Sequence, residues 1–188
     1  ALALASMARK LFGEQPERAV FTLYGSFAAT GSGHGTDKAL VAGILELATD
    51  DPRVADAFAL AKAAGVQVDI VDMDGDISKY KLVIAPMLYM YRAGFEKKMR
   101  KFVENGGTLV TTYWSGIVDD TDLCKMGGLP GDMMDVFGVW NEEIDSLPDG
   151  MKNGIVFNGS RYDAMELCAR IHPLTAEVLG TYEKDFYA

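Results

Sequence analysis

The chain has 188 residues, 49% of them hydrophobic and 24% charged, and a formal net charge of −9. That length suits one ordinary domain with a sizeable core and is too short for a complete (β/α)₈ barrel, which needs about 250 residues. The acidic balance argues against nucleic-acid and membrane-surface partners, because both attract basic proteins. Two cysteines are too few for a disulfide framework or a cysteine-ligated iron–sulfur cluster. We therefore expect a soluble, cytoplasmic α/β protein without a metal or cofactor.

Helices and strands are predicted to alternate from the start of the sequence to Gly65. Apolar residues spaced three and four apart predict an amphipathic helix over residues 3–12, and residues 19–25 read as a strand. A glycine-rich loop then leads into a second helix whose apolar face runs through residues 40–47. Two aspartates before Pro52 indicate a further helix start, and that helix stops at Gly65.

The same alternation continues to residue 114. Residues 66–72 form a predicted strand, and the uninterrupted apolar run at 81–86 is typical of a strand that is buried on both faces. The next helix has its apolar stripe between Phe95 and Val103, and the glycine pair that follows suits a helix C-cap. Residues 108–114 read as another buried strand.

The last third of the chain begins with a long glycine-rich stretch that reaches about residue 150. Beyond it we predict a strand at 153–158, a helix at 162–171 and a final strand at 176–182. Strand–helix–strand units with apolar strands favour an open, mostly parallel sheet flanked by helices, which is a flavodoxin-like α/β arrangement. Without a linker in the sequence, we expect residues 1–188 to form one α/β unit.

The segment GSGHGTD at residues 31–37 is the strongest candidate for a ligand site, since it lies between a strand and a helix. Glycines let a ligand approach the backbone, and free N–H groups at a helix start suit a phosphate or a carboxylate. His34, Thr36 and Asp37 are the candidate contacts. The spacing is neither GxGxxG nor a P-loop. The alternative interpretation is a tight turn in which Thr36 or Asp37 caps the helix.

Two acidic groups are weaker candidates. Asp119, Asp120 and Asp122 carry oxygens that suit a hard cation, but their spacing is not that of a calcium loop, and a solvated turn is favoured. Glu142 and Glu143 are adjacent, so on a strand their side chains are expected to point to opposite faces. Such a pair does not suit glycoside hydrolysis.

The remaining candidates for nucleophilic chemistry do not form a catalytic set. Ser115 follows a predicted strand without the G-x-S-x-G pattern of a nucleophile elbow. Cys124 lies in a glycine-rich loop, and Cys168 lies inside the predicted helix 162–171. His172 stands before a proline and reads as the end of that helix. We therefore expect no catalytic residue in the chain.

Four ordered blocks between residue 62 and the end of the chain carry a family resemblance. They are SKYKLVIAPMLYM at 78–90, FVENGGTLVTTYWSGIVDDTD at 102–122, GGLPGDMMDVFGVWNEEIDSLPDG at 127–150 and AEVLGTYEKDFYA at 176–188. This part resembles the trimerisation domain of glycoside hydrolase family 42 β-galactosidases. The resemblance implies a fold like that of class I glutamine amidotransferases, a non-catalytic role and a homo-oligomer, with a trimer favoured. The family's catalytic carboxylates belong to a preceding barrel domain that this sequence does not contain.

The segment that ends at Gly65 shows a different resemblance. The blocks LYGSFA at 23–28 and GHGTDKALVAGIL at 33–45 are similar to the β chain of iron–sulfur-dependent L-serine ammonia-lyases, also called serine dehydratases. The cluster cysteines of that family lie in another domain. What the resemblance implies here is a contact from His34, Thr36 and Asp37 to an amino-acid carboxylate.

Two families in one chain imply a chimera, with a seam near residues 61–72, where both have a helix followed by a strand. Three functions stay open at this point. The chain is an assembly module, a segment that binds serine or a similar anion, or a free-standing enzyme. The missing catalytic set makes the enzyme the weakest of the three, and the assembly module is our prediction.

Overall fold

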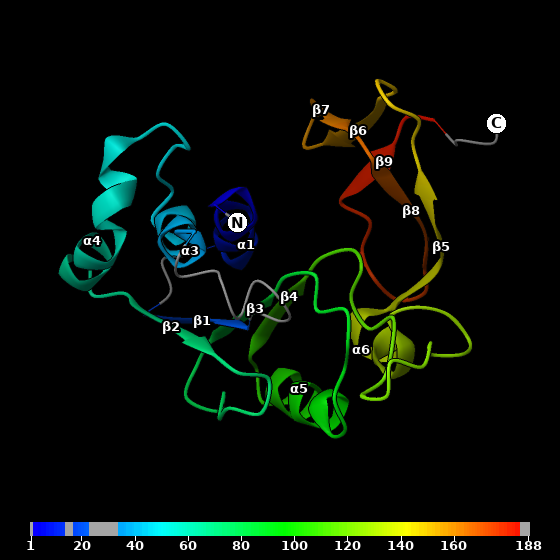
Figure 1. Ribbon diagram of the computed structural model, residues 1–188, viewed down its shortest axis with the longest axis horizontal. Helices are drawn as coiled ribbons and strands as arrows, with labels where there is room; N and C mark the ends of the chain where they lie inside the picture. Colours follow the sequence, from blue (N-terminus) through cyan, green and yellow to red (C-terminus); the bar gives the residue numbers. More distant parts are fainter. Residues whose placement is uncertain (1, 14–16, 23–33, 185–188) are drawn as a thin grey trace. The chain divides into compact units, whose positions relative to one another are not determined.

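The computed structural model describes residues 2–13, 17–22 and 34–184. Contacts within the chain divide it into two compact units, Ala1–Leu123 (unit 1) and Cys124–Ala188 (unit 2) (Figure 1). The predicted seam near residue 65 falls inside unit 1, and the assignment of the two flanking segments to different origins stays a prediction.

Unit 1 contains a four-stranded parallel sheet. Its strands are β1 (Arg18–Thr22), β2 (Gln67–Val71), β3 (Leu82–Ala85) and β4 (Thr108–Thr111), in the order β2-β1-β3-β4. Strand β1 is central, because it pairs in parallel with β2 on one side and with β3 on the other. The predicted parallel α/β sheet is therefore confirmed, and the segment before residue 66 supplies one of its two inner strands.

Helices cover both faces of this sheet, with α1 and α3 on one side and α5 on the other (Figure 1). The helical elements are α1 (Leu2–Phe12), α3 (Thr36–Ile44), the 3₁₀-helix η1 (Pro52–Asp56), α4 (Ala57–Ala63) and α5 (Phe95–Glu104). The predicted start at Pro52 is confirmed, since the Asp51 carboxylate accepts a hydrogen bond from Arg53 N at 2.9 Å. On α5 the predicted apolar stripe is buried at Phe95, Met99 and Phe102 and half-buried at Val103.

The core of unit 1 is built mainly from β1, β3, α1 and α3. Val20 and Phe21 on β1 and all four residues of β3 are buried, as expected for inner strands of a parallel sheet. The prediction of a second fully buried strand at 108–114 is wrong. Among the described strands, β4 pairs only with β3 and is half-buried along its length, because it lies at an edge of the sheet.

Unit 2 contains short helices and two antiparallel sheets. Its elements are η2 (Gly131–Met133), α6 (Met134–Phe137), β5 (Val139–Ser146), β6 (Asn153–Phe157), β7 (Ser160–Ala164), β8 (Leu167–Pro173) and β9 (Gly180–Tyr182). Strands β5 and β8 form a two-stranded ribbon, and the second sheet has the order β7-β6-β9. Part of the glycine-rich stretch is thus structured, which its composition did not indicate.

The helix predicted at 162–171 is wrong, because this segment forms parts of β7 and β8. A short apolar run does not distinguish helix from strand, and the partner strands decide here. Asn158 and Gly159 both have a positive φ and join β6 to β7 through a two-residue turn. Asn-Gly is the preferred sequence for such a hairpin, so a signal for the correct structure was present.

Candidate functional site

The carboxyl ends of the four parallel strands meet at one edge of the sheet in unit 1. From β1 the chain crosses first to β2 and then back over to β3, so the order of the sheet reverses between β1 and β3. Open α/β sheets bind ligands at such a reversal, outside the carboxyl ends of the strands. The connection from β1 to α3, which contains the predicted segment 31–37, starts from this edge.

Within the predicted segment, residues 31–33 lie outside the described residues. His34 is exposed, Thr36 begins α3, and Asp37 lies in its first turn. The N-cap is Gly35, with a left-handed φ of 70° and no side-chain cap, so capping by Thr36 or Asp37 is wrong. The Asp37 carboxylate instead accepts a hydrogen bond from Lys38 N at 2.8 Å. Carboxylate binding by His34, Thr36 and Asp37 stays a prediction.

Hydroxyl groups tie together the loops that follow β3 and β4. The buried Ser115 accepts hydrogen bonds from Leu88 N at 3.2 Å and from the Thr111 hydroxyl at 2.8 Å. Thr112 Oγ1 accepts one from Met87 N at 2.8 Å. Met87 and Trp114 both have a positive φ, of 44° and 62°. Ser115 therefore holds strained loops in place, and its hydroxyl is used in structure.

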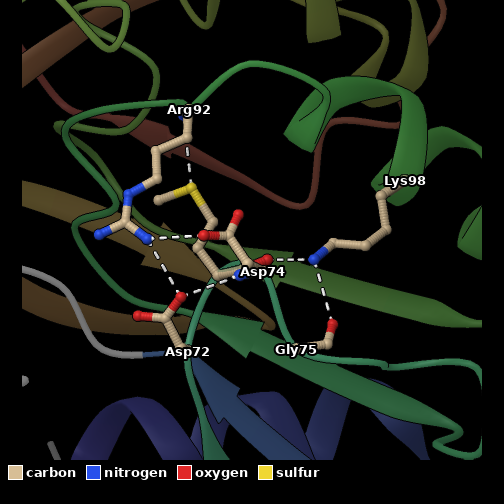
Figure 2. Close-up of polar contacts among 6 residues, drawn as sticks. Asp72, Asp74, Gly75, Arg92 and Lys98 are labelled. Carbon is tan, nitrogen blue, oxygen red and sulfur yellow. Dashed lines mark hydrogen bonds and ion pairs between the residues drawn. The ribbon is translucent and has the colours of Figure 1, made fainter.

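The acidic loop after β2 is held by two cations (Figure 2). The Arg92 guanidinium contacts the carboxylates of Asp72 at 3.1 Å and Asp74 at 2.9 Å. The Lys98 ammonium, which extends from α5, donates hydrogen bonds to the carbonyls of Met73 and Gly75. The ammonium thus occupies the space that a bound cation would need between these carbonyls. We call these contacts of Arg92 and Lys98 with residues 72–75 the clamp. The sequence analysis did not predict it, although the alternating aspartates after the strand could have indicated its acidic side.

The protonation of the clamp follows from its contacts. The hydrogen bond from the backbone N–H of Asp74 holds the pKa of Asp72 below its ordinary value. Desolvation opposes this shift, and the nearby charge of Arg92 adds to it. Burial lowers the pKa of Lys98, and the charges of Asp74, Asp72 and Asp76 oppose that shift. The lowered pKa keeps Asp72 charged at neutral pH, while three carboxylates favour the charged form of Lys98. The clamp is thus a set of charged contacts that hold the loop after β2 in place.

We expect Lys98→Met to keep the apolar stem of the side chain and to remove the hydrogen bonds to the acidic loop. The loss is about 2 kcal/mol of stability, because two part-buried carbonyls lose a charged hydrogen-bond donor. Hydrogen exchange of residues 72–76 should accelerate, as measured by mass spectrometry. Lys101→Met on the same helix is the matched control, and equal exchange in both variants would contradict the clamp.

On the ribbon of unit 2, a β-bulge redirects the two adjacent glutamates. The register of β5 against β8 shifts between Asn141 and Glu143, so Glu142 is the extra residue. As a result both carboxylates lie within reach of Arg170, at 3.9 and 3.4 Å, and the expectation of opposite faces is wrong. They are paired with a cation and with His172, whose Nε2 is 2.8 Å from Glu142.

His172 and Cys168 lie on β8 rather than on a helix, which corrects both predictions. The imidazole ring stacks on Trp140 with the ring centroids 4.7 Å apart. Cys168 is buried and Cys124 is exposed. The contacts of His172 with Trp140 and Glu142 link β8 to β5, and no nucleophile–base pair arises among the described contacts of these side chains.

The aspartates at 119–122 form a turn, as favoured above. The Asp119 carboxylate accepts hydrogen bonds from Thr121 N at 2.9 Å, from the Thr121 hydroxyl at 2.7 Å and from Leu123 N at 3.1 Å. Across the described residues, no three His, Cys, Asp or Glu side chains are grouped to hold a metal ion. None of the described helices has the length and apolar character to cross a bilayer.

Two protein families match the sequence. Residues 46–188 match the family described as the beta-galactosidase trimerisation domain, which is about three quarters of the chain. Residues 3–85 match the serine dehydratase beta chain, which is less than half of it. The two matches overlap between residues 46 and 85, across the predicted seam.

Curated relatives show the same resemblance. Beta-galactosidase Pbg of Clostridium perfringens is 51% identical over 129 residues, which is 65% of this chain and 19% of that protein. Beta-galactosidase BglY of Alicyclobacillus acidocaldarius is 47% identical over 130 residues, with the same coverage. The chain therefore spans about a fifth of the length of these relatives.

Solved structures resemble almost the whole chain. The cold-adapted beta-galactosidase of Rahnella sp. R3 has a TM-score of 0.65 and 36% identity, covering 90% of this chain and 25% of that one. The beta-galactosidase of Bacillus circulans sp. alkalophilus has a TM-score of 0.64 and 34% identity, covering 95% and 26%. The likeness in structure thus extends beyond the 65% of the chain that aligns with the relatives in sequence.

Proposed function

Because this chain belongs to the family of β-galactosidase trimerisation domains, we propose that it is a non-catalytic module that associates with copies of itself. In the curated relatives the matching region is about a fifth of a longer β-galactosidase. In this proposal the chain holds subunits together, and catalysis belongs to other parts of a longer protein.

The distribution of apolar side chains in unit 2 carries the proposal. Among the residues that the structure describes there, four apolar side chains are buried, namely Met133, Leu147, Cys168 and Ala169. Ten large apolar side chains of the same unit are exposed, whereas the described part of unit 1 exposes seven and buries 25. Exposed apolar surface in such excess is typical of an interaction surface. Unit 2 therefore gains its missing burial by association.

The contacts of the candidate catalytic groups support a structural role. The Ser115 hydroxyl is used to tie two loops together, and Glu142 and Glu143 are paired with Arg170. A serine nucleophile and a pair of glycosidase carboxylates need other neighbours. Each of these side chains has a structural explanation.

The N-terminal segment supports the chimera only in part. Its strand β1 is an inner strand of the sheet in unit 1, so a serine dehydratase-like segment would replace a strand and helix of the galactosidase fold rather than precede them. Structural likeness over 90% of the chain is consistent with such a replacement. Serine binding by this segment is supported by no described contact of residues 34–37.

Native mass spectrometry tests the proposal, because it reports subunit mass and stoichiometry together. We expect a species with three times the 20.4 kDa mass of one chain. A monomer at micromolar concentration would contradict self-association. A dimer or tetramer would keep self-association and overturn the threefold stoichiometry.

A further inference from the structure

Three of the four asparagines in the sequence, Asn105, Asn153 and Asn158, are followed by glycine. Asparagine is chemically labile before glycine, because the glycine nitrogen can attack the side-chain carbonyl carbon (Cγ) of the asparagine and no side chain hinders its approach. The reaction needs a side-chain amide that is free to turn and a backbone nitrogen that no other contact holds. The three pairs differ in both respects.

The pair Asn153–Gly154 is fixed within strand β6. Asn153 is buried, its Nδ2 donates a hydrogen bond to the Lys184 carbonyl at 2.8 Å, and its Oδ1 accepts one from Gly154 N at 2.8 Å. The same Oδ1 accepts from Lys184 N at 3.2 Å. A Cβ at Gly154 would overlap the Glu183 side chain, so there is no open space on that side. Reaction at this pair requires β6 to open, and the folded state therefore protects it.

The pair Asn105–Gly106 is exposed at the end of helix α5, but its backbone nitrogen is held. Asn105 is the C-cap residue, and its N–H donates to the Lys101 carbonyl at 3.1 Å. Gly106 N donates a hydrogen bond to the Val103 carbonyl at 2.9 Å. Attack by Gly106 N requires the end of the helix to give up this bond. The helix end thus slows the reaction without burying the asparagine.

The pair Asn158–Gly159 forms the turn between β6 and β7 and meets both requirements (Figure 1). Both residues are exposed. Across the residues that the structure describes, no hydrogen bond holds the Asn158 side chain or Gly159 N. A Cβ at Gly159 would have no atom within 4 Å apart from its neighbours in the chain, so the space around this residue is open.

We propose that Asn158 is a site of spontaneous modification, at which the side-chain amide becomes a carboxylate through a succinimide ring formed with Gly159. Gly159 N bonds to Cγ of Asn158 and loses its proton, the Cγ–Nδ2 bond breaks, and ammonia leaves with that proton, which solvent carries. Water then adds to one of the two ring carbonyls and opens the ring. One opening yields aspartate, and the other yields isoaspartate, whose backbone runs through Cβ and Cγ. Water is the only co-reactant, and no atom is oxidised or reduced.

The two products affect the hairpin differently. Aspartate adds a negative charge, leaves the backbone unchanged and tolerates a left-handed conformation as asparagine does. Isoaspartate adds one methylene group to the backbone of a two-residue turn, and the pairing of Phe157 with Ser160 depends on the length of that turn. Among the described strands, β7 pairs only with β6, whereas β9 pairs with β6 on its other side. Isoaspartate should therefore loosen β7 and leave β9 in place.

Peptide mapping by mass spectrometry, on the full chain incubated in mildly alkaline buffer, tests the site. We expect Asn158 to convert at least about fivefold faster than Asn105, the factor that one backbone hydrogen bond represents, and Asn153 to be slower still. The matched control is the same chain in concentrated urea, where these contacts are absent and the three rates should converge. Conversion of Asn105 or Asn153 as fast as Asn158 in the folded chain would overturn the proposal. An unchanged spread of rates in urea would overturn it too, because neighbours in sequence would then explain the difference.

Asn158→Asp separates the effect of charge from that of backbone length. The freshly purified variant has the charge of the product on a normal backbone, so hydrogen exchange of residues 160–164 should match that of the unmodified chain. In the incubated wild-type chain, exchange of these residues should accelerate in proportion to the isoaspartate content, which fragmentation by electron transfer measures, while residues 180–182 keep their rates. Equal acceleration in Asn158→Asp would overturn the role of the lengthened turn by assigning the effect to charge.

Discussion

Gly43→Ala is expected to lower the stability of unit 1 by about 3 kcal/mol, near the upper end of what overpacking costs. Helices α1 and α3 meet at this position, where an added Cβ would lie 2.6 Å from Ala5 Cβ and 2.9 Å from Ser6 N. Part of this contact is backbone, which cannot move away as the end of a flexible side chain can. The gain in helix propensity from alanine, about 1 kcal/mol, does not offset the overlap.

Urea denaturation followed by circular dichroism measures the effect. Ala5→Gly in the Gly43→Ala background relieves the overlap with one methyl group, so the double variant should recover part of the loss. Non-additivity of the two changes is the signature of direct contact. A negligible decrease for Gly43→Ala, with additive behaviour in the double variant, would show that α1 does not pack on α3.

The second large effect is a loss of stability at alkaline pH that depends on Tyr80. This tyrosine is buried, and its hydroxyl donates a hydrogen bond to Asp69 at 2.6 Å. Burial, together with the Asp69 carboxylate, raises the pKa of Tyr80 from 10 to about 12. The folded state thus favours the neutral phenol. Its contribution is complete below pH 10 and is lost between pH 10 and pH 12, by about 2–3 kcal/mol for two pKa units.

Tyr80→Phe removes the ionisable group and should reduce, without abolishing, the fall of the unfolding free energy over that pH range. At neutral pH the variant loses about 1 kcal/mol, because one hydrogen bond is missing while Asp69 still accepts from Gln67 at 3.0 Å. Burial also raises the pKa of Tyr91, so a smaller alkaline decrease remains. Tyr113→Phe, at an exposed tyrosine of the same unit, is the control. Identical alkaline curves for wild type and Tyr80→Phe would contradict this assignment.

The two units illustrate different ways of reaching stability. In unit 1 the inner strands and α1, α3 and α5 enclose an extensive apolar core. In unit 2 a two-stranded ribbon and a three-stranded sheet bury little apolar surface. Small sheets of this kind are marginal in isolation. Association through an apolar surface is a physical solution for unit 2, and it agrees with the family to which the chain belongs.

Sequence periodicity predicted most elements of unit 1 correctly because burial there follows the repeat of each element. Helix α5 has its apolar residues on one face, and β3 is uniformly apolar, so local pattern and tertiary environment agree. The same reasoning failed at residues 162–171. Strand β8 pairs with β5, and β6 and β7 lie between these two strands in the sequence. No local residue pattern encodes so distant a partner.

In the candidate site, too, some features followed from the sequence and others only from the tertiary structure. The sequence indicated the connection after β1, and the topology of the sheet agrees that ligand sites of this fold class lie at that edge. Sequence spacing did not reveal the clamp on the acidic loop, because Arg92 and Lys98 lie far beyond the aspartates in the chain. Nor did it reveal that a bulge brings Glu142 and Glu143 to one guanidinium.

By itself the sequence determined the family and the parallel α/β sheet, since these follow from residue order and residue type. Only the tertiary structure decided that β1 is an inner strand, that unit 2 is built from antiparallel pairs and that the Gly138 carbonyl accepts hydrogen bonds from residues 174–176. The physical reason is that these features depend on backbone hydrogen bonds between segments far apart in the chain. Such bonds are nearly independent of side-chain identity, so the residue pattern carries little record of them.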